Sequence, residues 1–131
     1  MKHAAIALLA ALPLLFVACK KEEEGPTIGS SVRFMTEAGY TFAGDTVPRQ
    51  DTLLVGVVIT PGSDRPHHFK ITVSYDGGSF QTTDSIRLGS TPIEFEKRIY
   101  TRNQVGTELW RFNIVENDGD VVRRSMLFHV Q

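Results

Sequence analysis

Apolar and polar residues alternate with a period of two through most of the chain after residue 30. No stretch there sustains the apolar spacing of a helix. A period of two puts successive side chains on opposite faces of an extended chain, so it predicts strands with one buried face. The clearest example is residues 69–75. The same pattern, weaker in the first two cases, marks residues 80–88, 93–99, 110–115 and 122–130.

Other segments refine this prediction. Residues 53–59 are apolar on both faces, as in a central strand covered on each side. Val32 and Phe34 begin a short first strand. Trp110 shares its face with apolar residues and is therefore predicted in the core, whereas Arg124 interrupts the apolar face of the last strand.

Turn-forming residues separate the predicted strands. Residues 61–66 break the chain after the central strand, and residues 76–78 and 117–119 carry the Asp-Gly chemistry of hairpins. About seven strands in roughly 100 residues predict an all-β, antiparallel two-sheet β-sandwich. Jelly-roll or barrel closure fits the same count.

The closing stretch, residues 109–119, resembles the penultimate strand and last hairpin of immunoglobulin-like modules in bacterial surface lipoproteins. This resemblance covers most of residues 30–131 and implies an immunoglobulin-like sandwich. The cysteine pair of antibody domains is absent, because the chain has a single cysteine. The resemblance therefore concerns the architecture and not the antibody family.

The first 18 residues read as a secretory signal peptide. Lys2 gives a basic tip, and residues 4–18 follow without a charge. A transmembrane anchor is the weaker interpretation, because the run is shorter than about 20 residues and contains Pro13.

The leader ends at residues 16–19, Phe-Val-Ala-Cys, which resembles a bacterial lipobox. The resemblance implies cleavage after Ala18 and acylation of Cys19, which becomes the membrane anchor. Multiple acyl chains hold a domain stably at a bilayer surface. The predicted organisation is a signal peptide at 1–18, a lipidated cysteine and charged tether at 19–29, and a domain at 30–131.

The tether begins with a charged segment: Lys20, Lys21, Glu22, Glu23 and Glu24. Residues 20–27 have no apolar side chain to place in a core, so a solvated spacer is one interpretation of them. The segment also resembles the surface-export signal of Bacteroidota-type lipoproteins. That resemblance implies an outer-membrane lipoprotein facing the cell exterior rather than the periplasm.

Three Asp-Ser/Thr-aliphatic triplets resemble the O-glycosylation site of that bacterial group, with Thr46, Thr52 and Ser85 as the acceptors. The alternative is that hydroxyl residues beside Asp are ordinary turn and strand-end residues.

Metal ligands are not predicted. Adjacent strand residues point to opposite faces, so His67 and His68 diverge. Residues 116–120 cluster carboxylates, but they lack the spacing of a calcium loop, and a hairpin accounts for them.

Catalytic residues are also not predicted. Glu94 and Glu96 share a strand face, which permits an acid-base hypothesis, but a solvated sheet surface is the favoured interpretation because nothing in the sequence marks a cleft. Tyr40 and Tyr100 are the candidate platform for stacking on sugars.

A formal net charge of −1 argues against a nucleic-acid or other polyanionic partner, and no cofactor motif is present. The predicted function is a non-enzymatic binding or structural module with a protein or glycan ligand. The alternatives are a glycan-binding accessory lipoprotein of a polysaccharide-utilisation system and, more weakly, a small hydrolase.

Overall fold

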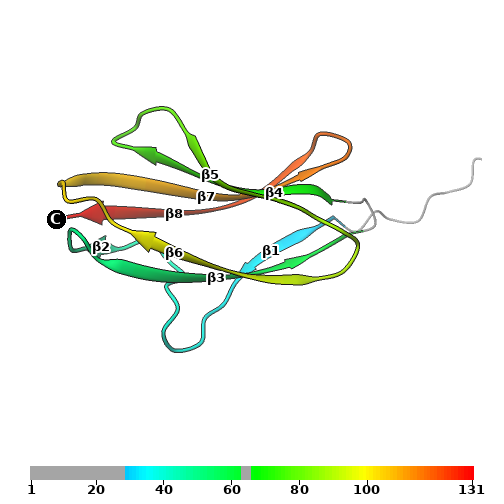
Figure 1. Cartoon of the computed structure of the whole chain (residues 1–131), viewed down its shortest axis with the longest axis horizontal. Helices are drawn as coiled ribbons and strands as arrows, with labels where there is room; N and C mark the ends of the chain where they lie inside the picture. The colour runs from blue at the N-terminus through cyan, green and yellow to red at the C-terminus, as the bar shows by residue number, and fades with distance from the viewer. Residues whose placement is uncertain (1–28, 63–65) are drawn as a thin grey trace, which may run out of the picture.

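The computed structural model describes residues 29–62 and 66–131. The predicted signal peptide, Ala18, Cys19 and the charged segment 20–24 lie outside these residues. The described residues form eight strands: β1 (Ser31–Phe34), β2 (Thr46–Val47), β3 (Thr52–Thr60), β4 (Pro66–Tyr75), β5 (Gln81–Arg87), β6 (Ile93–Tyr100), β7 (Gly106–Glu116) and β8 (Val121–Val130) (Figure 1). Within the described ranges, no helix is long and apolar enough to cross a membrane.

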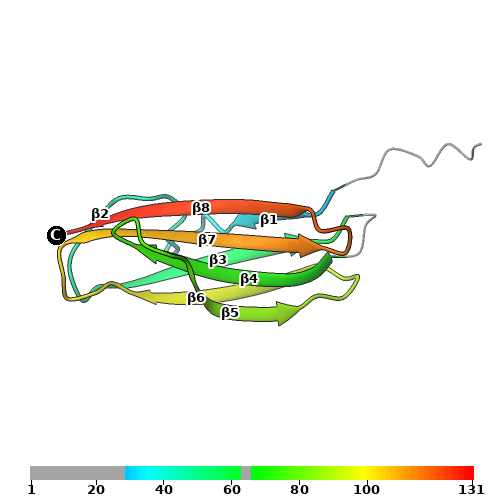
Figure 2. The ribbon, with the colours of Figure 1, turned by 90° about the horizontal axis from the view of Figure 1, so that it is seen from above.

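The strands form two sheets that face each other (Figures 1 and 2). One sheet has the order β1-β3-β6, and the other has the order β2-β8-β7-β4-β5. All neighbours are antiparallel except β2 and β8, which are parallel. In chain order these are the A, B and E strands against the C, F and G strands of an immunoglobulin fold. The predicted all-β, two-sheet immunoglobulin-like sandwich is therefore confirmed.

The structure has one strand more than the seven that the alternation indicated. β2 contains only two residues, Thr46 and Val47, and pairs with the end of β8. β1 belongs to the opposite sheet, so the chain changes sheets between residues 34 and 46. A two-residue strand shows no periodicity, which is why sequence pattern alone did not reveal it.

Inward-facing side chains of both sheets fill the space between them. Each large apolar side chain buried here contributes about 1.5–3 kcal/mol. Trp110 is 4% exposed, so its predicted core position is confirmed. Aromatic pairs join the sheets edge to face: Phe34 and Phe112 lie 5.2 Å apart between ring centroids, and Phe69 and Phe95 lie 5.9 Å apart. Such geometry suits the ring quadrupole.

The outer side of β3 is covered by a loop rather than by a third layer. Residues 35–45 leave β1 and cross β3 on the side away from the five-stranded sheet (Figure 1). The Met35 amide donates to the Gly56 carbonyl at 2.8 Å, and the Thr41 amide donates to the Leu54 carbonyl at 2.7 Å. The prediction of a central strand is correct, and this loop explains its apolar outer face.

Arg124, which interrupts the inward face of β8, lies near the edge of the sandwich. Its Nε donates to the Val32 carbonyl of β1 at 3.2 Å. Arg124 can therefore occupy an inward position, because its Nε links the two sheets while the rest of its exposed side chain stays in water.

Candidate binding face

The outer side of the five-stranded sheet carries four cationic side chains. Phe69, Ile71 and Phe112 point inward with no exposed surface, so alternation places their neighbours outward. We call the outward side of β4, β5, β7 and β8 the basic face; its cations are Lys70, Arg87, Arg111 and Arg123.

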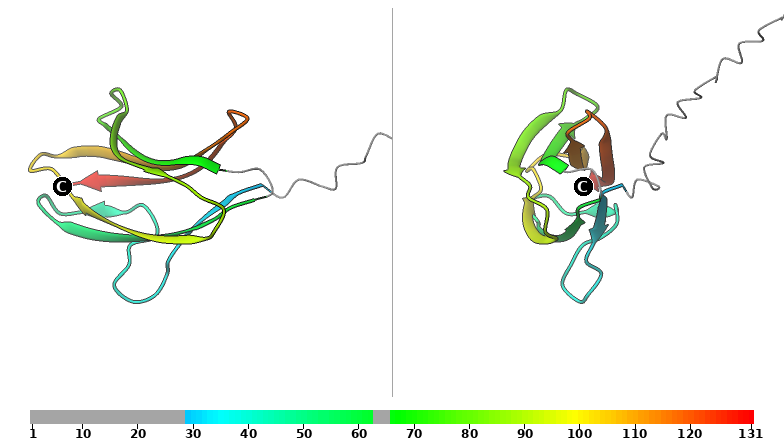
Figure 3. Two further views of the ribbon diagram at one scale, coloured as in Figure 1. Left: turned by 45° about the vertical axis from the view of Figure 1, so that its right-hand side comes forward. Right: turned by 90° about the vertical axis from the view of Figure 1, so that its right-hand side faces the viewer.

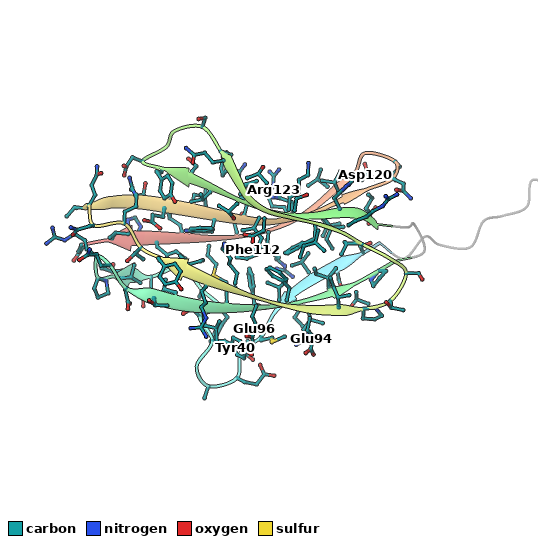
Figure 4. The ribbon with its side chains drawn as sticks, in the orientation of Figure 1. Tyr40, Glu94, Glu96, Phe112, Asp120 and Arg123 are labelled. Atoms are coloured by element: carbon teal, nitrogen blue, oxygen red, sulfur yellow. The ribbon has the colours of Figure 1, made fainter. Side chains whose placement is uncertain are left out.

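Strand register brings residues from four strands into line on this face. Arg123 lies opposite Asn113, Asn113 lies opposite Lys70, and Lys70 lies opposite Ser85. Neighbouring strands are about 4.8 Å apart, so this row extends over about 14 Å. The adjacent row contains Ser125, Arg111, Thr72 and Thr82. Figure 4 shows Arg123 on the outer side of the sheet and Phe112 between the sheets.

Local contacts hold two of these cations in place. The Arg123 Nε donates to Asn113 Oδ1 at 2.8 Å, and Asn113 Nδ2 donates to the Lys70 carbonyl at 3.3 Å. The Arg111 guanidinium lies 3.9 Å from the centre of the Phe80 ring. Its Nε is buried without a hydrogen-bond partner in the described part of the chain. An unmet buried donor costs about 1–3 kcal/mol, so this arrangement carries a cost in stability.

No carboxylate shares the face among the described residues of these strands. Asp84 of β5 is on the other side, where it pairs with Lys97 of β6 at 2.8 Å. The four cations therefore have no carboxylate within ion-pair distance in residues 29–62 and 66–131. This concentrates positive charge on a chain whose net charge is −1.

The outer side of the three-stranded sheet is different. There the Tyr40 hydroxyl donates to Glu96 Oε1 at 2.6 Å (Figure 4). This hydrogen bond, followed by desolvation and by the negative charges of Glu96, Glu37 and Glu94, raises the pKa of Tyr40 above its ordinary value. We call this surface the tyrosine-glutamate face, comprising the outward side of β1, β3 and β6 with the loop 35–45.

The two predicted platform tyrosines both belong to the tyrosine-glutamate face but are separated along it. Tyr100 is 66% exposed at the end of β6. Tyr40 is held at Glu96, four positions earlier on the same strand, which corresponds to about 13 Å. The structure therefore offers two separate rings and not one continuous aromatic surface.

Glu94 and Glu96 are both exposed on β6. A carboxyl that acts as general acid in a glycosidase is held in a water-poor pocket, and Glu96 already accepts the Tyr40 hydroxyl. A shallow hollow of about 310 Å³ beside β2 is lined by Thr46, Val47, Pro48 and Gln131, which provide no acid or base.

The three predicted O-glycosylation acceptors are exposed. Thr46 and Thr52 begin β2 and β3, and each backbone N–H donates to the carboxylate of the preceding Asp, at 2.7 and 2.9 Å. These contacts agree with the alternative to glycosylation, in which a hydroxyl residue beside Asp is an ordinary strand-end residue. Ser85 lies within β5 on the basic face. Modification of all three residues stays a prediction.

The acidic hairpin between β7 and β8 brings three carboxylates within 4.8 Å of one another. The Glu116 carboxylate accepts the Ser30 amide at 3.1 Å, and the Asp118 carboxylate accepts the Asp120 amide at 3.0 Å. Gly119 has a φ of 92°, as the turn requires. These contacts give two of the carboxylates a conformational role.

The two histidines that were considered as metal ligands belong to β4. His68 is half-buried, at a position opposite Val115 of β7 and Arg87 of β5. The side chain of His67 lies outside the described part of the structure.

Sequence reasoning missed a buried glutamate at the opposite end of the sandwich. Glu108 has no exposed surface, and its carboxylate accepts the Arg102 amide, Arg102 Nε and Trp110 Nε1 at 2.9, 3.3 and 3.3 Å. Arg102 also bonds Asp76 at 3.0 Å, and this bond is the main reason that the pKa of Asp76 is lowered. Glu108 lies two positions before Trp110 and so shares its inward face. A charged residue on this apolar face was the signal from which a buried glutamate could have been predicted.

No protein-family model matches the chain, and no curated protein matches it. Two solved structures are similar in outline. One is a conjugate transposon protein (residues 27–141) from Bacteroides vulgatus, with a TM-score of 0.47, 12% identity, and coverage of 78% of this chain and 85% of that chain. The other is murine CRIg, with a TM-score of 0.36, 10% identity, and coverage of 78% and 96%.

Proposed function

We propose that this chain is an outer-membrane lipoprotein, anchored by acyl chains on Cys19 and exposed to the cell exterior, whose immunoglobulin-like domain is a non-enzymatic binding module. The observation that carries the anchor is the position of the single cysteine, directly after an uncharged run that ends in Phe-Val-Ala. Lysine and glutamate residues 20–24 support export to the surface.

The start of the domain supports this arrangement. The Ser30 amide donates to Glu116, and the Gly62 amide donates to Ser30 Oγ at 3.1 Å. These bonds fix the point where the chain enters the sandwich, at the end that also holds the β7–β8 hairpin (Figure 2). Eleven positions separate Cys19 from Ser30, which allow a reach of at most about 40 Å. Both broad faces lie along the sides of the domain, away from this attachment (Figure 3).

Metabolic labelling with a clickable fatty acid tests the anchor. Wild type is expected to incorporate the label and to fractionate with outer membranes, and Cys19→Ala is expected to lose both properties. Equal labelling of the two proteins would contradict lipidation at Cys19.

Surface exposure needs a separate test. Replacing residues 20–24 by uncharged residues is expected to protect the domain from protease added to intact cells while leaving fatty-acid labelling unchanged. Equal protease sensitivity of the two proteins would remove the export role of this segment.

A glycan-binding accessory role is the second candidate. It is favoured by Tyr100, which is 66% exposed, and by the hydroxyl groups of the basic face. Retardation in affinity electrophoresis against a polysaccharide panel tests this role. The hydrolase alternative is weaker because Glu94 and Glu96 lie on an open surface; turnover of a polysaccharide that is lost in Glu94→Ala or Glu96→Ala would revive it.

A further inference from the structure

We infer that the basic face binds an acidic polysaccharide, a polymer whose sugars carry carboxylate or sulfate groups. The inference deepens the proposed binding function and rests on it only for access to such a polymer outside the cell.

Charge complementarity is the first support. Lys70, Arg87, Arg111 and Arg123 project from one sheet surface, and no carboxylate accompanies them on the described strands of that surface. The imbalance is local, because the chain as a whole has 14 basic and 15 acidic residues. The net charge, from which we expected no polyanionic partner, therefore does not describe this face. Like charges on one face repel each other, and bound anions relieve this repulsion.

The groups between the cations favour a sugar polymer. Ser125, Thr72 and Thr82 occupy one of the two central rows and offer hydroxyls that exchange hydrogen bonds with sugar hydroxyls. Arg guanidinium groups form paired hydrogen bonds with carboxylate or sulfate oxygens.

A protein partner fits this surface less well. Lysine and serine are depleted at the core of protein-protein interfaces, whereas the two central rows here hold Lys70 and Ser125. The apolar outward pairs lie toward the two ends of the face, Leu109 with Leu127 and Val115 with Val121.

The extent of the face favours a polymer over a small anion. Its cations are distributed over four strands and about 14 Å, so one small anion reaches only part of them. A chain carrying repeated negative charges engages several cations together, and such linked contacts raise the overall affinity without any single strong site.

The test uses the full chain in a neutral detergent and beads that carry polygalacturonate, dextran sulfate or neutral dextran. Wild type is expected to bind at least one acidic polymer, to release as NaCl rises, and to pass the neutral beads. Lys70→Gln/Arg87→Gln is expected to weaken retention about tenfold or more, because the variant loses two of the four cations that contact the polymer. Neither side chain has a side-chain hydrogen bond or ion pair in the described part of the structure, so the fold is expected to persist.

Arg33→Gln/Arg98→Gln is the matched control, since it removes the same charge from the tyrosine-glutamate face. Its retention is expected to equal that of wild type. Ser85→Arg adds a cation beside Lys70 and is expected to strengthen binding, so it keeps the test decisive if a glutamine variant fails to fold.

Two results on the beads would overturn the inference: no retention on either acidic polymer, or an equal loss of retention in both double variants. The inference would also fail if the protein bound anionic phospholipid vesicles or an acidic protein but neither acidic polymer. All these results are independent of fatty-acid labelling at Cys19. A failed anchor and a failed binding face are therefore distinguishable.

Discussion

The two broad faces of the sandwich differ in how their polar side chains are satisfied. On the tyrosine-glutamate face, the loop 35–45 covers β3, and Tyr40 bonds Glu96. On the basic face, four cations stand without a carboxylate among the described residues. Both faces are built by the same strand alternation, so the difference lies in what the rest of the chain adds. Side chains of the chain itself complete the first face, whereas the second face carries positive charge that no carboxylate of the described residues compensates.

Close packing under the loop predicts the largest effect. A Cβ at Gly56 would lie 2.6 Å from Met35 Sδ and 2.8 Å from Tyr40 Cε1. Gly56→Ala is therefore expected to displace the loop and to lower the free energy of unfolding by about 1–3 kcal/mol, as measured by urea denaturation. Gly89→Ala is the control, because nothing lies within 4 Å of a Cβ there. Equal stability of the two variants would mean that the loop does not pack as described.

The aromatic support of the basic face predicts a smaller effect. Phe80→Ala removes the ring beneath Arg111 and is expected to cost about 0.5–1 kcal/mol. Phe42 is also exposed but lies on the loop of the other face, so Phe42→Ala is the matched control. Urea denaturation compares the two. A larger loss for Phe42→Ala would reverse this part of the comparison.

Screening of the four uncompensated cations by salt is expected to change the free energy of unfolding by only about a few tenths of a kcal/mol. Added NaCl is expected to raise the stability of wild type by about 0.2–0.5 kcal/mol relative to Lys70→Gln/Arg87→Gln, because salt weakens repulsion between exposed like charges. Thermal unfolding at several NaCl concentrations measures the difference. Parallel salt dependence in the two proteins would mean that the cations do not repel one another appreciably.

The Tyr40–Glu96 contact predicts a shift in titration. Glu96→Gln is expected to lower the pKa of Tyr40 toward its ordinary value, whereas the pKa of Tyr75, raised mainly by burial, is expected to stay unchanged. NMR titration of ring-labelled tyrosines measures both. In wild type, the folded protein retains the Tyr40 proton above pH of about 10 while the unfolded chain loses it, so this contribution to stability falls as pH rises. An unmoved Tyr40 pKa would contradict the contact.

The sequence was sufficient for the sandwich but not for its surfaces. Local patterns, a period of two in five segments and an apolar run at residues 53–59, indicated about seven strands, and the alternation placed Trp110 in the core. The contact of Tyr40 with Glu96 joins residues 56 positions apart. Only the register between strands could show that Lys70 and Arg123 share one row, although both were recognisable as polar positions of their strands.

Arginine footprinting compares the two faces within one sample. The full chain is treated with phenylglyoxal with and without a saturating acidic polysaccharide, and each arginine is quantified by peptide mass spectrometry. We expect the polymer to protect Arg87 and Arg123 and to leave the exposed Arg33 and Arg98 as reactive as before. Protection of Arg33 and Arg98 instead, or equal protection of all four, would contradict the assignment of the basic face.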